Sequence, residues 1–395
     1  MKRFFCFLAV TLSLSTALKA QDAYYDVYAL DTLRNYDIDV IEVTTTKATR
    51  TTPVAQDNLT KESLIRSAYG ADMPTALALT PSIIATNETG IGIGATAIRL
   101  RGTDATRINV TINGVAMNNP DSHSMYWYDT PDLISSVGTV QVQRGAGVST
   151  NGTGAFGGSV SMTTDAMSTE FGGSASLSYG SYNTNKQGVH ISSGLMRDHW
   201  VVDARLTHIG SDGYIDRGAT DLKSYMLQAG YYGSNTKGKF LSFGGSAKTY
   251  LTYNGVSRKD MERYGRRYHD SGQYVTSDGP FVLEDDTHVA YYDDQTDNYL
   301  QFNNQLVLNH RFNNRWQLNA TLFYTYGYGY YNQYKDDAWL SSYLNLSTSI
   351  EQADLIRHKL MYNHLGGINA SASYSSRNID LTFGGSYSYY TCPHW

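Results

Sequence analysis

Long runs in which every second residue is apolar are the feature that most constrains the fold of this chain. Over residues 318–330, apolar or aromatic residues alternate with residues that are mostly small or polar. The same period of two residues recurs over 173–179, 241–253 and 379–389. Because successive side chains of a strand point to opposite faces, each run predicts a β-strand with one apolar and one polar face.

These runs are long for a soluble sheet, whose strands typically have ~5–6 residues. A strand that crosses a bilayer needs ~9–11 residues, apolar toward lipid and polar toward the lumen, with aromatic residues near its ends. The chain holds 33 Tyr, and several lie at the ends of the runs. The pattern therefore favours an antiparallel transmembrane β-barrel over a soluble β-sandwich, and apolar faces such as Leu241, Phe243 and Ala247 are expected to meet lipid.

The links between these runs differ in length. The links containing SYNTNK, RDH, SNTKGK and NNR are short, whereas residues 254–296 and 336–354 form long polar links. In outer-membrane barrels the periplasmic turns are short and the extracellular loops are longer. The larger loop gathers basic and aromatic side chains, and Arg263, Arg266 and Tyr268 are candidates for ligand binding. A charged loop that is merely solvated is the alternative.

The N-terminus has the pattern of a secretory signal peptide. Lys2 and Arg3 precede the apolar residues 4–14, and Ala20 offers a small residue for cleavage. Such a short apolar run does not span a bilayer as a helix. The polar segment that follows it disfavours the alternative, a buried N-terminal helix.

Composition argues against several functions. The formal net charge is −5, so nothing points to nucleic acid as a partner. Cleavage after Ala20 removes Cys6 and leaves Cys392 as the single thiol, which predicts neither a disulfide nor a cysteine-based zinc site. The sequence also lacks the motifs of serine hydrolases and zinc proteases. We expect no enzyme, no cofactor and no bound metal.

Residues 53–165 have a mixed α/β character. Residues 61–68 and 73–79 predict two short helices, and Asp72 is the expected capping residue of the second. The stretches TAIRLRG, INVTING and TVQVQRG predict strands. The dipeptide Asn113-Gly114 favours a tight hairpin turn.

The stretch NGTGAFGGSVSMTT contains a literal G-x-G-x-x-G at Gly152, Gly154 and Gly157. A dinucleotide site needs this motif to follow a strand and to open a helix. The residues that follow it, SVSMTT, alternate like a strand and have no helical period. The sequence therefore argues against a nucleotide cofactor, and the glycines are expected to allow tight turns and close backbone approach.

One segment, NNPDSHSMYWYD, combines polar and aromatic residues of the kind found on surfaces. Within it His123, Tyr126 and Trp127 are candidates for contact with a ligand. A single histidine is more often structural than ligand-binding, so a structural role stays open.

Residues 53–164 resemble the plug domain of TonB-dependent outer-membrane receptors. The resemblance rests on LALTPSI, on AIRLRGTDATRINVTINGVAMNNP and on VQVQRGAGVSTNGTGAFGGSVSMTT. The alternating strands after residue 170 look like the barrel that follows such a plug, and ADLIRHKL resembles a barrel segment of receptors of the Bacteroidetes type. The positions that match the plug pattern are Arg99, Arg101, Gly102, Asn113, Gly114, Arg144, Gly145, Gly152, Gly154, Gly157 and Gly158.

The resemblance implies a domain order and a mechanism. It implies a signal peptide at 1–20, a periplasmic extension at 21–52, a plug domain at 53–165 and a part of a transmembrane barrel at 170–395. Such receptors lie in the lipid of the cell outer membrane and bind a scarce solute outside the cell, commonly an iron complex (a siderophore or haem) or cobalamin. The plug blocks the barrel until the inner-membrane protein TonB pulls on an N-terminal box.

The segment IDVIEVT lies where the family has this box. An extended, β-prone segment adds to the edge of a partner's sheet through main-chain hydrogen bonds. Glu42 departs from the usual run of the family, and an ordinary linker strand is the alternative. The candidate box residues are Ile38, Asp39, Val40, Ile41, Glu42, Val43 and Thr44.

The same resemblance would place Arg99, Arg101 and Arg144 on the plug. Arginine forms bidentate hydrogen bonds with carboxylates, so these residues are expected to hold the plug against acidic groups of the barrel wall. A solvated position at the plug edge is the alternative for each of them.

A barrel that encloses a plug has ~22 strands, and the residues after 170 have room for about nine. We therefore expect a mainly β chain in which a small α/β plug domain precedes an antiparallel transmembrane β-barrel that looks truncated. This polypeptide alone is not expected to transport. The alternative function is that of a non-transporting outer-membrane surface protein, an adhesin or a passive small barrel.

Overall fold

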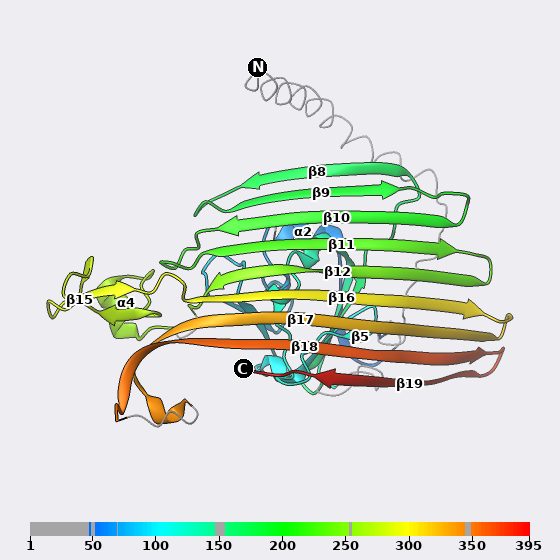
Figure 1. Cartoon of the computed structure of the whole chain (residues 1–395). Helices are drawn as coiled ribbons and strands as arrows, with labels where there is room; N and C mark the ends of the chain where they lie inside the picture. Colours follow the sequence, from blue (N-terminus) through cyan, green and yellow to red (C-terminus); the bar gives the residue numbers. More distant parts are fainter. Residues whose placement is uncertain (1–46, 49–51, 69, 147–154, 253–254, 344–348) are drawn as a thin grey trace, which may run out of the picture. The chain divides into compact units, whose positions relative to one another are not determined.

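The computed structural model describes residues 47–48, 52–68, 70–146, 155–252, 255–343 and 349–395, and Ile41–Trp395 form one compact unit. This unit contains an N-terminal domain, built from residues 55–164, and a nine-stranded antiparallel sheet that follows it in the chain (Figure 1). The predicted signal peptide, the candidate box at 38–44, Gly152 and Gly154 lie outside the described residues.

In the nine-stranded sheet, the order of the strands is their order in the chain, and neighbouring strands run antiparallel. The sequence prediction of about nine alternating strands is confirmed. The shortest of these strands has 9 residues and the longest have 24. The strands are β8 Phe171–Tyr179, β9 Asn185–Ser193, β10 Trp200–Ser211, β11 Thr220–Tyr232, β12 Thr236–Tyr250, β16 Thr296–Arg311, β17 Trp316–Trp339, β18 Gln352–Ser375 and β19 Asp380–Thr391.

The sheet has an apolar outer face, and its inner face toward the N-terminal domain is polar except for an apolar area on β10 to β12. On the outer face Leu206, Leu306 and Leu322 expose 64%, 49% and 50% of their surface, and Leu306 lies opposite Leu322 in the register of β16 and β17. On the inner face Gln228 and Gln305 are almost fully buried. Apolar outside and polar inside is the arrangement that lipid and lumen require of a membrane barrel.

Strand β12 departs from the predicted orientation. The sequence led us to expect Leu241, Phe243 and Ala247 to meet lipid, but all three are buried against the N-terminal domain. Phe240 points to the other face and is 39% exposed. The prediction was wrong because alternation shows only that the two faces of a strand differ, whereas the surface opposite each face decides which one lies inside.

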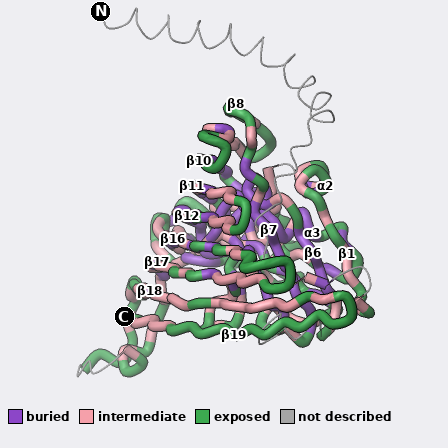
Figure 2. Tube along the Cα trace, turned by 90° about the vertical axis from the view of Figure 1, so that its right-hand side faces the viewer, coloured by how far each residue is buried: buried purple, intermediate pink, exposed green. Residues whose placement is uncertain are grey.

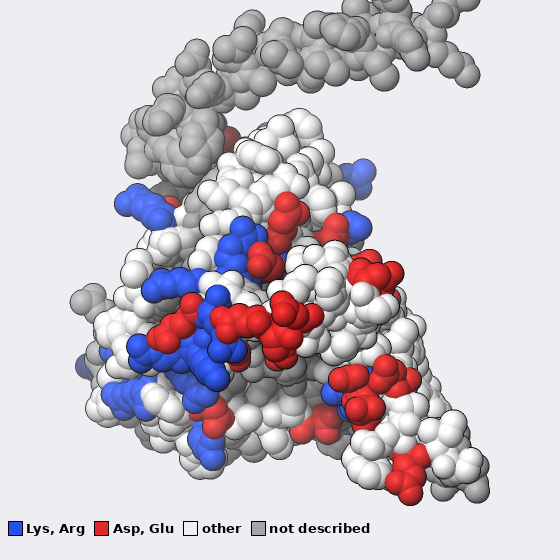
Figure 3. Space-filling view, turned by 90° about the vertical axis from the view of Figure 1, so that its left-hand side faces the viewer, with Lys and Arg blue, Asp and Glu red and all other residues white. Residues whose placement is uncertain are grey.

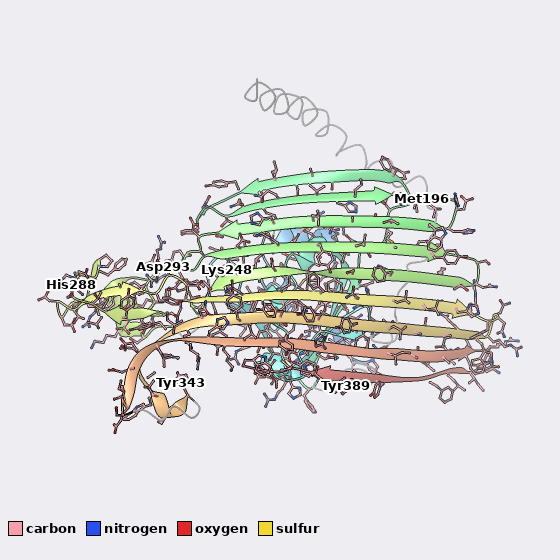
Figure 4. The ribbon with its side chains drawn as sticks, in the orientation of Figure 1. Met196, Lys248, His288, Asp293, Tyr343 and Tyr389 are labelled. Carbon is pink, nitrogen blue, oxygen red and sulfur yellow. The ribbon has the colours of Figure 1, made fainter. Side chains whose placement is uncertain are left out.

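The links between the strands lie at two ends of the sheet. The short turns after β9, β11, β16 and β18 share one end, where Met196 lies, and the long loops 251–295 and 340–351 share the other, near Lys248 and Asp293 (Figure 4). The short link at 180–184 lies at the long-loop end as well, because strands alternate in direction. The loops contain α4 Arg258–Tyr264, the small sheet of β13 Gln273–Val275, β15 His288–Tyr291 and β14 Phe281–Val282, and the 3-10 turn η6 Leu340–Ser342.

Aromatic pairs occupy the short-turn end of the sheet. The rings of Trp200 and Tyr231 are 4.9 Å apart, and those of Trp316 and Tyr374 are 5.1 Å apart. Trp200 and Trp316 expose 50% and 42% of their surface. Half-exposed tryptophan and tyrosine at strand ends fit the interface between lipid and water.

The N-terminal domain contains the strands and helices that the sequence predicts. Thr60 caps the first helix, where Ser63 N donates to Thr60 Oγ1 at 3.4 Å. Asn113 and Gly114 both have positive φ, 51° and 78°, as a tight hairpin turn of this type requires. Its elements are β1 Ala55–Thr60, α2 Lys61–Ser67, α3 Met73–Leu77, β2 Ile83–Asn87, β3 Thr96–Leu100, η2 Ala105–Arg107, β4 Ile108–Ile112, β5 Val115–Ala116, η3 Trp127–Asp129, η4 Leu133–Ser135, β6 Val137–Arg144 and β7 Gly158–Thr164, with the five-stranded order β1-β6-β7-β4-β5.

Asp72 precedes α3 at the expected capping position, but its carboxylate serves another segment. It accepts hydrogen bonds from Gly94 N at 2.8 Å and from Thr96 Oγ1 at 3.3 Å, and no side-chain cap forms on α3. Asp72 is buried. It therefore joins the start of α3 to residues 88–95, which link β2 to β3 and are called the apex loop below.

One apolar cluster joins α2, α3 and the domain's strands to the inner face of the nine-stranded sheet. Leu64, Leu77 and Val160 belong to it, and so do Met226 and Leu241 from β11 and β12. Figure 2 shows the buried residues concentrated along β6 and β7, whereas β19 is mostly exposed. Within the described ranges, no helix is long and apolar enough to cross a membrane.

Candidate functional site between the N-terminal domain and the sheet

A buried ion pair ties the N-terminal domain to β9. Lys186 Nζ lies 2.5 Å from Asp132 Oδ1, and it also donates to Ser135 Oγ at 3.1 Å. The Asp132 side chain is 1% exposed and the Lys186 side chain 15%. Removing one partner of a pair this well shielded from water strongly destabilises the folded protein, because the other partner is left as an unpaired buried charge.

Asp165, which follows β7, collects a second group of basic residues. Its carboxylate pairs with Lys61 of the same domain, and Arg205 Nη2 of β10 lies 3.6 Å from its Oδ2. Lys239 of β12 donates to Thr164 Oγ1 at 2.7 Å and approaches Asp165 O at 3.5 Å. The wall of the sheet thus supplies positive charge, and the domain supplies the carboxylates.

The Asn113-Gly114 turn also meets the sheet. Asn113 Nδ2 donates to Gln305 Oε1 at 3.2 Å, and Gln305 Nε2 donates to Ile112 O at 3.3 Å. Asn369 Nδ2 donates to Gly114 O at 3.0 Å. Neutral side-chain amides of β16 and β18 therefore bind this turn. The sequence predicted the turn but not its contact with the sheet.

The apex loop packs into the sheet through apolar side chains. Ile93 lies in a cluster with Ile209, Leu222 and Ala247 of β10, β11 and β12. Gly94 has φ +92°, and a Cβ added to it would lie 2.7 Å from Thr220 Oγ1. The loop needs glycine both for its conformation and for its close approach to the sheet.

Residues 48–159 match the family model of the TonB-dependent receptor plug domain. This segment is a TonB-dependent receptor plug domain. The match runs from Ala48 into β7 and so includes the apex loop and the residues of the Asn113-Gly114 turn. A comparison with curated protein sequences gave no match.

The plug domain and the sheet together have the fold of solved import receptors and transporters. The closed form of the ferric-catecholate import receptor Fiu from E. coli K12 matches with a TM-score of 0.62 and 16% identity, over 86% of this chain and 47% of that one. The unliganded ferric citrate transporter FecA gives 0.62 and 16%, over 86% and 48%. The copper transporter OprC gives 0.61 and 14%, over 88% and 47%. The chain spans about half the length of the solved structures it matches.

The arginines expected to hold the plug against the wall do not contact a wall carboxylate in the described residues. Arg144 pairs with Asp57 of β1, within the plug domain, and also donates to Pro81 O at 3.4 Å. Arg99 and Arg101 are exposed. Arg99 and Arg101 therefore correspond to the alternative, a solvated plug edge. In the ion pairs that do join the two parts, lysine and arginine come from the sheet and aspartate comes from the plug.

The plug glycines that are described either allow close packing of the backbone or adopt a positive φ. Gly157 N donates to Arg107 O and Gly145 N to Gly157 O, both at 2.9 Å, so this part of the chain is held by its backbone. Cβ atoms added to Gly157 and Gly158 would lie 2.0 Å from Thr103 Oγ1 and 2.3 Å from Gln143 O. Gly102 and Gly145 have φ of +79° and +88°, which glycine adopts without strain.

The first group of ligand candidates lies on the plug loop before η3. His123 is exposed, and Tyr126 is 40% exposed with its ring 6.0 Å from that of Tyr128. Trp127 is 3% exposed and belongs to the plug core. Two of the three side chains are therefore open to a solute, while the Trp127 ring packs inside the domain.

The second group of candidates lies on the loop that contains α4. Arg263 Nε is 2.7 Å from Glu284 Oε2, the Tyr268 ring is 4.7 Å from that of Tyr264, and Arg266 is exposed. Burial raises the pKa of the Tyr268 hydroxyl to about 12. Viewed from the long-loop end, Lys and Arg gather on one part of the surface with Asp and Glu against them (Figure 3).

The loop at 212–219, which the sequence did not single out, connects the apex loop to the α4 loop. Tyr214 N donates to Thr89 O at 2.9 Å, and Asp216 N donates to Arg267 O at 2.9 Å. Arg267 Nε also lies 3.0 Å from Asp216 Oδ1. A movement of the plug apex is therefore linked by direct contacts to the loops at this end of the sheet.

His269 fixes the same junction as a neutral ring. Its Nε2 donates to Asp216 O at 2.5 Å, and its Nδ1 accepts from Ser271 N at 3.2 Å. Arg217 donates to His269 O at 2.8 Å and lies 3.4 Å over the centre of the Tyr291 ring. Burial, with the nearby Arg217, lowers the pKa of His269 to about 4. The junction therefore keeps its hydrogen bonds at neutral pH.

Proposed function

We propose that this chain is part of an outer-membrane receptor that takes up a scarce solute by a TonB-energised mechanism, and that it is not an enzyme. The observation that carries the proposal is a plug domain bound to the polar inner face of a sheet whose outer face is apolar. A plug held by partly buried ion pairs and amide hydrogen bonds would close a pore at rest. Work is needed to displace it, which suits coupling to a force supplied from the periplasm.

We place the protein in the outer membrane after removal of residues 1–20, with the outer face of the sheet in contact with lipid. The long-loop end then faces the medium, and the short-turn end faces the periplasm. TonB is the proposed periplasmic partner, and it would bind residues 38–44 by strand addition. The resemblance of residues 353–360 to receptors of the Bacteroidetes type remains a prediction.

The proposed ligand class is an iron complex, a siderophore or haem, with cobalamin as the other candidate. Support comes from the import receptors for ferric catecholate and ferric citrate that share this fold. The residues proposed to meet the ligand are His123 and Tyr126 on the plug, and Arg263, Arg266 and Tyr268 on the α4 loop. Trp127 would support the plug loop from inside the domain.

Deletion of residues 38–44 at the gene's own locus tests the energy coupling. Cells are given radiolabelled ferric catecholate, ferric citrate, haem and cobalamin in parallel, and surface binding is measured separately from accumulation. We expect the deletion to abolish accumulation of one of these probes and to leave its surface binding intact. A deletion of equal length at residues 24–30 is the matched control and should retain uptake.

Accumulation that survives the deletion of residues 38–44 would overturn the coupling. The alternative, a non-transporting adhesin or passive barrel, predicts that neither deletion changes the entry of any probe and that a proton uncoupler has no effect.

A further inference from the structure

The end of the β17–β18 hairpin carries its positive charge on one face. Both strands continue past the start of β16 at the long-loop end, where they curve away from the other strands (Figure 1). Thr325 of β17 and Asn363 of β18 line a cavity against the plug domain, so every second residue from them lies on the same inner face. Toward the long-loop end this face carries Tyr331, Gln333 and Lys335 on β17, and Lys359, Arg357 and Leu355 on β18. Its three basic residues, Lys335, Arg357 and Lys359, are called the inner cations below.

The carboxylates at the end of the hairpin do not lie among the inner cations. Asp354, on the opposite face of β18, accepts a hydrogen bond from the Tyr334 hydroxyl at 2.8 Å and from Asp337 N at 3.0 Å. Asp336 lies beside Asp354. The alternation of side chains along the strands thus separates the charges, with the basic residues toward the lumen and Asp354 away from it.

None of the inner cations forms an ion pair within the part of the chain that the structure describes. Arg357 Nη2 donates to the Tyr331 hydroxyl at 3.3 Å and to Gln333 Oε1, which are both uncharged acceptors. Lys359 is exposed, and its Nζ lies 6.0 Å from the centre of the Tyr331 ring. Lys335 is the diagonal neighbour of Arg357 across the two strands, which separates their backbones by about 7–8 Å. Three positive charges are therefore held close together.

One carboxylate, Asp297, shares the inner face with these cations. It lies opposite Tyr331 in the register of β16 and β17, and its Oδ2 accepts from the Tyr128 hydroxyl of the plug domain at 3.2 Å. Three positive charges against this single carboxylate leave the inner face of the hairpin positive. An anion that binds there reduces the repulsion among the cations.

The inner cations lie on the same wall as Tyr126, the exposed aromatic residue of the plug loop. Tyr126 lines one cavity together with Asn363 of β18. Lys359 and Arg357 lie four and six residues from Asn363 on the same face, which is about 14 and 20 Å along a strand. With the long-loop end toward the medium, a solute on its way to Tyr126 passes these cations first.

We propose that the inner cations form a binding site for solutes that carry two or more anionic oxygen groups. The Arg357 guanidinium offers paired N–H donors to a carboxylate, and the two lysines offer point charges. Among the ligand classes proposed above, the site favours multiply anionic iron chelates over uncharged complexes. Its part in uptake rests on the proposed function, whereas binding of the anion does not.

Equilibrium binding of labelled iron chelates to the whole chain in detergent tests the site. Ferric citrate and a ferric tricatecholate are the multiply anionic probes, and a ferric trihydroxamate is the uncharged probe. At low salt, we expect at least one anionic probe to bind about tenfold more tightly than the uncharged probe. Lys359→Gln removes an exposed charge and should weaken this binding about fivefold. Lys223→Gln, which removes the same charge from the outer face of β11, is the control and should leave it unchanged.

The salt dependence of binding to the unchanged protein is a second measurement, which needs no variant to fold. Raising the salt concentration from about 20 mM to about 500 mM should weaken binding of the anionic probe about tenfold, because salt screens its attraction to the inner cations. Equal affinity for the anionic and uncharged probes, or no binding of either anionic probe, would overturn the proposal. If binding depends on charge but uptake survives the deletion of residues 38–44, the anion site stands and only the energy coupling fails.

Discussion

The side-chain amide of Gln141 binds both backbone polar atoms of Ala48. Ala48 N donates to Gln141 Oε1 at 2.7 Å, and Gln141 Nε2 donates to Ala48 O at 3.0 Å. Gln143 Nε2 donates to the same Oε1 at 2.8 Å and fixes the Gln141 side chain. Ala48 is buried, and it follows the candidate box by four residues. Together with the hydrogen bond from Lys47 Nζ to Thr139 Oγ1 at 3.0 Å, the Gln141 side chain holds the stretch between the candidate box and β1.

Gln141→Leu should release Ala48. The substitution removes both hydrogen bonds to Ala48 and leaves its backbone without these partners in a buried position, a loss of about 1–3 kcal/mol. It also removes the hydrogen bonds of Gln141 with Asn58 Oδ1 and Gln143 Nε2, both at 2.8 Å, which adds to the loss. Hydrogen exchange of the Ala48 amide is expected to accelerate about tenfold or more, while the amides of β6 and β7 stay protected. Thr139→Val on the same strand, which removes only the 3.0 Å contact with Lys47 Nζ, is the control. An unchanged exchange rate of the Ala48 amide in the Gln141→Leu variant would contradict the proposal that Gln141 fixes the backbone of Ala48.

The Asp132–Lys186 pair should contribute strongly to the binding of the plug domain to the sheet. Lys186→Met leaves the Asp132 carboxylate buried and unpaired, so it is expected to cost about 3–5 kcal/mol. Asp132→Asn keeps a residue that tolerates the positive φ of 55° at this position. The double variant should be less destabilised than the sum of the two single variants, because no unpaired charge remains. Denaturant unfolding in detergent gives the free energy of unfolding of the unchanged protein, the two single variants and the double variant. Additive effects would show that Asp132 and Lys186 are not coupled.

Gly158→Ala should destabilise the plug domain by about 1–3 kcal/mol or more, because the added Cβ meets the backbone oxygen of Gln143 at 2.3 Å. Gly172→Ala is the control, since nothing lies within 4 Å of a Cβ at that position, and it should change stability by less than about 0.5 kcal/mol. Trp127, buried in the plug core, provides the fluorescence signal for plug unfolding in a background in which the other four Trp are replaced by Phe. An unchanged stability of the Gly158→Ala variant would indicate that β7 shifts to accept the side chain.

The strands and the plug elements could be predicted from the sequence because each rests on a local pattern. The period of two residues defines β17 and β19, and the positive φ required at Asn113 and Gly114 matches their residue types. The contacts between the two parts could not be predicted in the same way. Lys186 and Lys239 are single basic residues within polar strand faces, and only the packing of the plug domain gives each a carboxylate or hydroxyl partner.

The expectation for Arg144 failed for the same reason. Its carboxylate partner, Asp57, lies 87 residues away in the sequence, and a pairing over that separation is set by the register of β1 and β6. The apex loop was overlooked because GIGIG, although isoleucine occupies every second position, consists otherwise of glycine and so has neither a polar face nor a functional motif. Its role becomes visible only where Ile93 packs against β10 and β11.

The buried Asp72 should make the stability of the plug domain depend on pH. Burial raises its pKa to about 7 from the ordinary value of 3.8, so the folded state binds a proton more tightly than the unfolded state does. Its contribution is fully present below pH ~3.8 and is lost as the pH rises through about 7, by at most about 4 kcal/mol. Asp72→Asn should flatten this part of the dependence, whereas Asp121→Asn, at an exposed position, should leave it unchanged. Burial also raises the pKa of Glu88 to about 7, so Glu88 makes the same contribution to the pH dependence of stability in both variants. Denaturant midpoints at several pH values, read from Trp127 fluorescence, decide the matter, and equal pH profiles for Asp72→Asn and the unchanged protein would exclude Asp72 as the source.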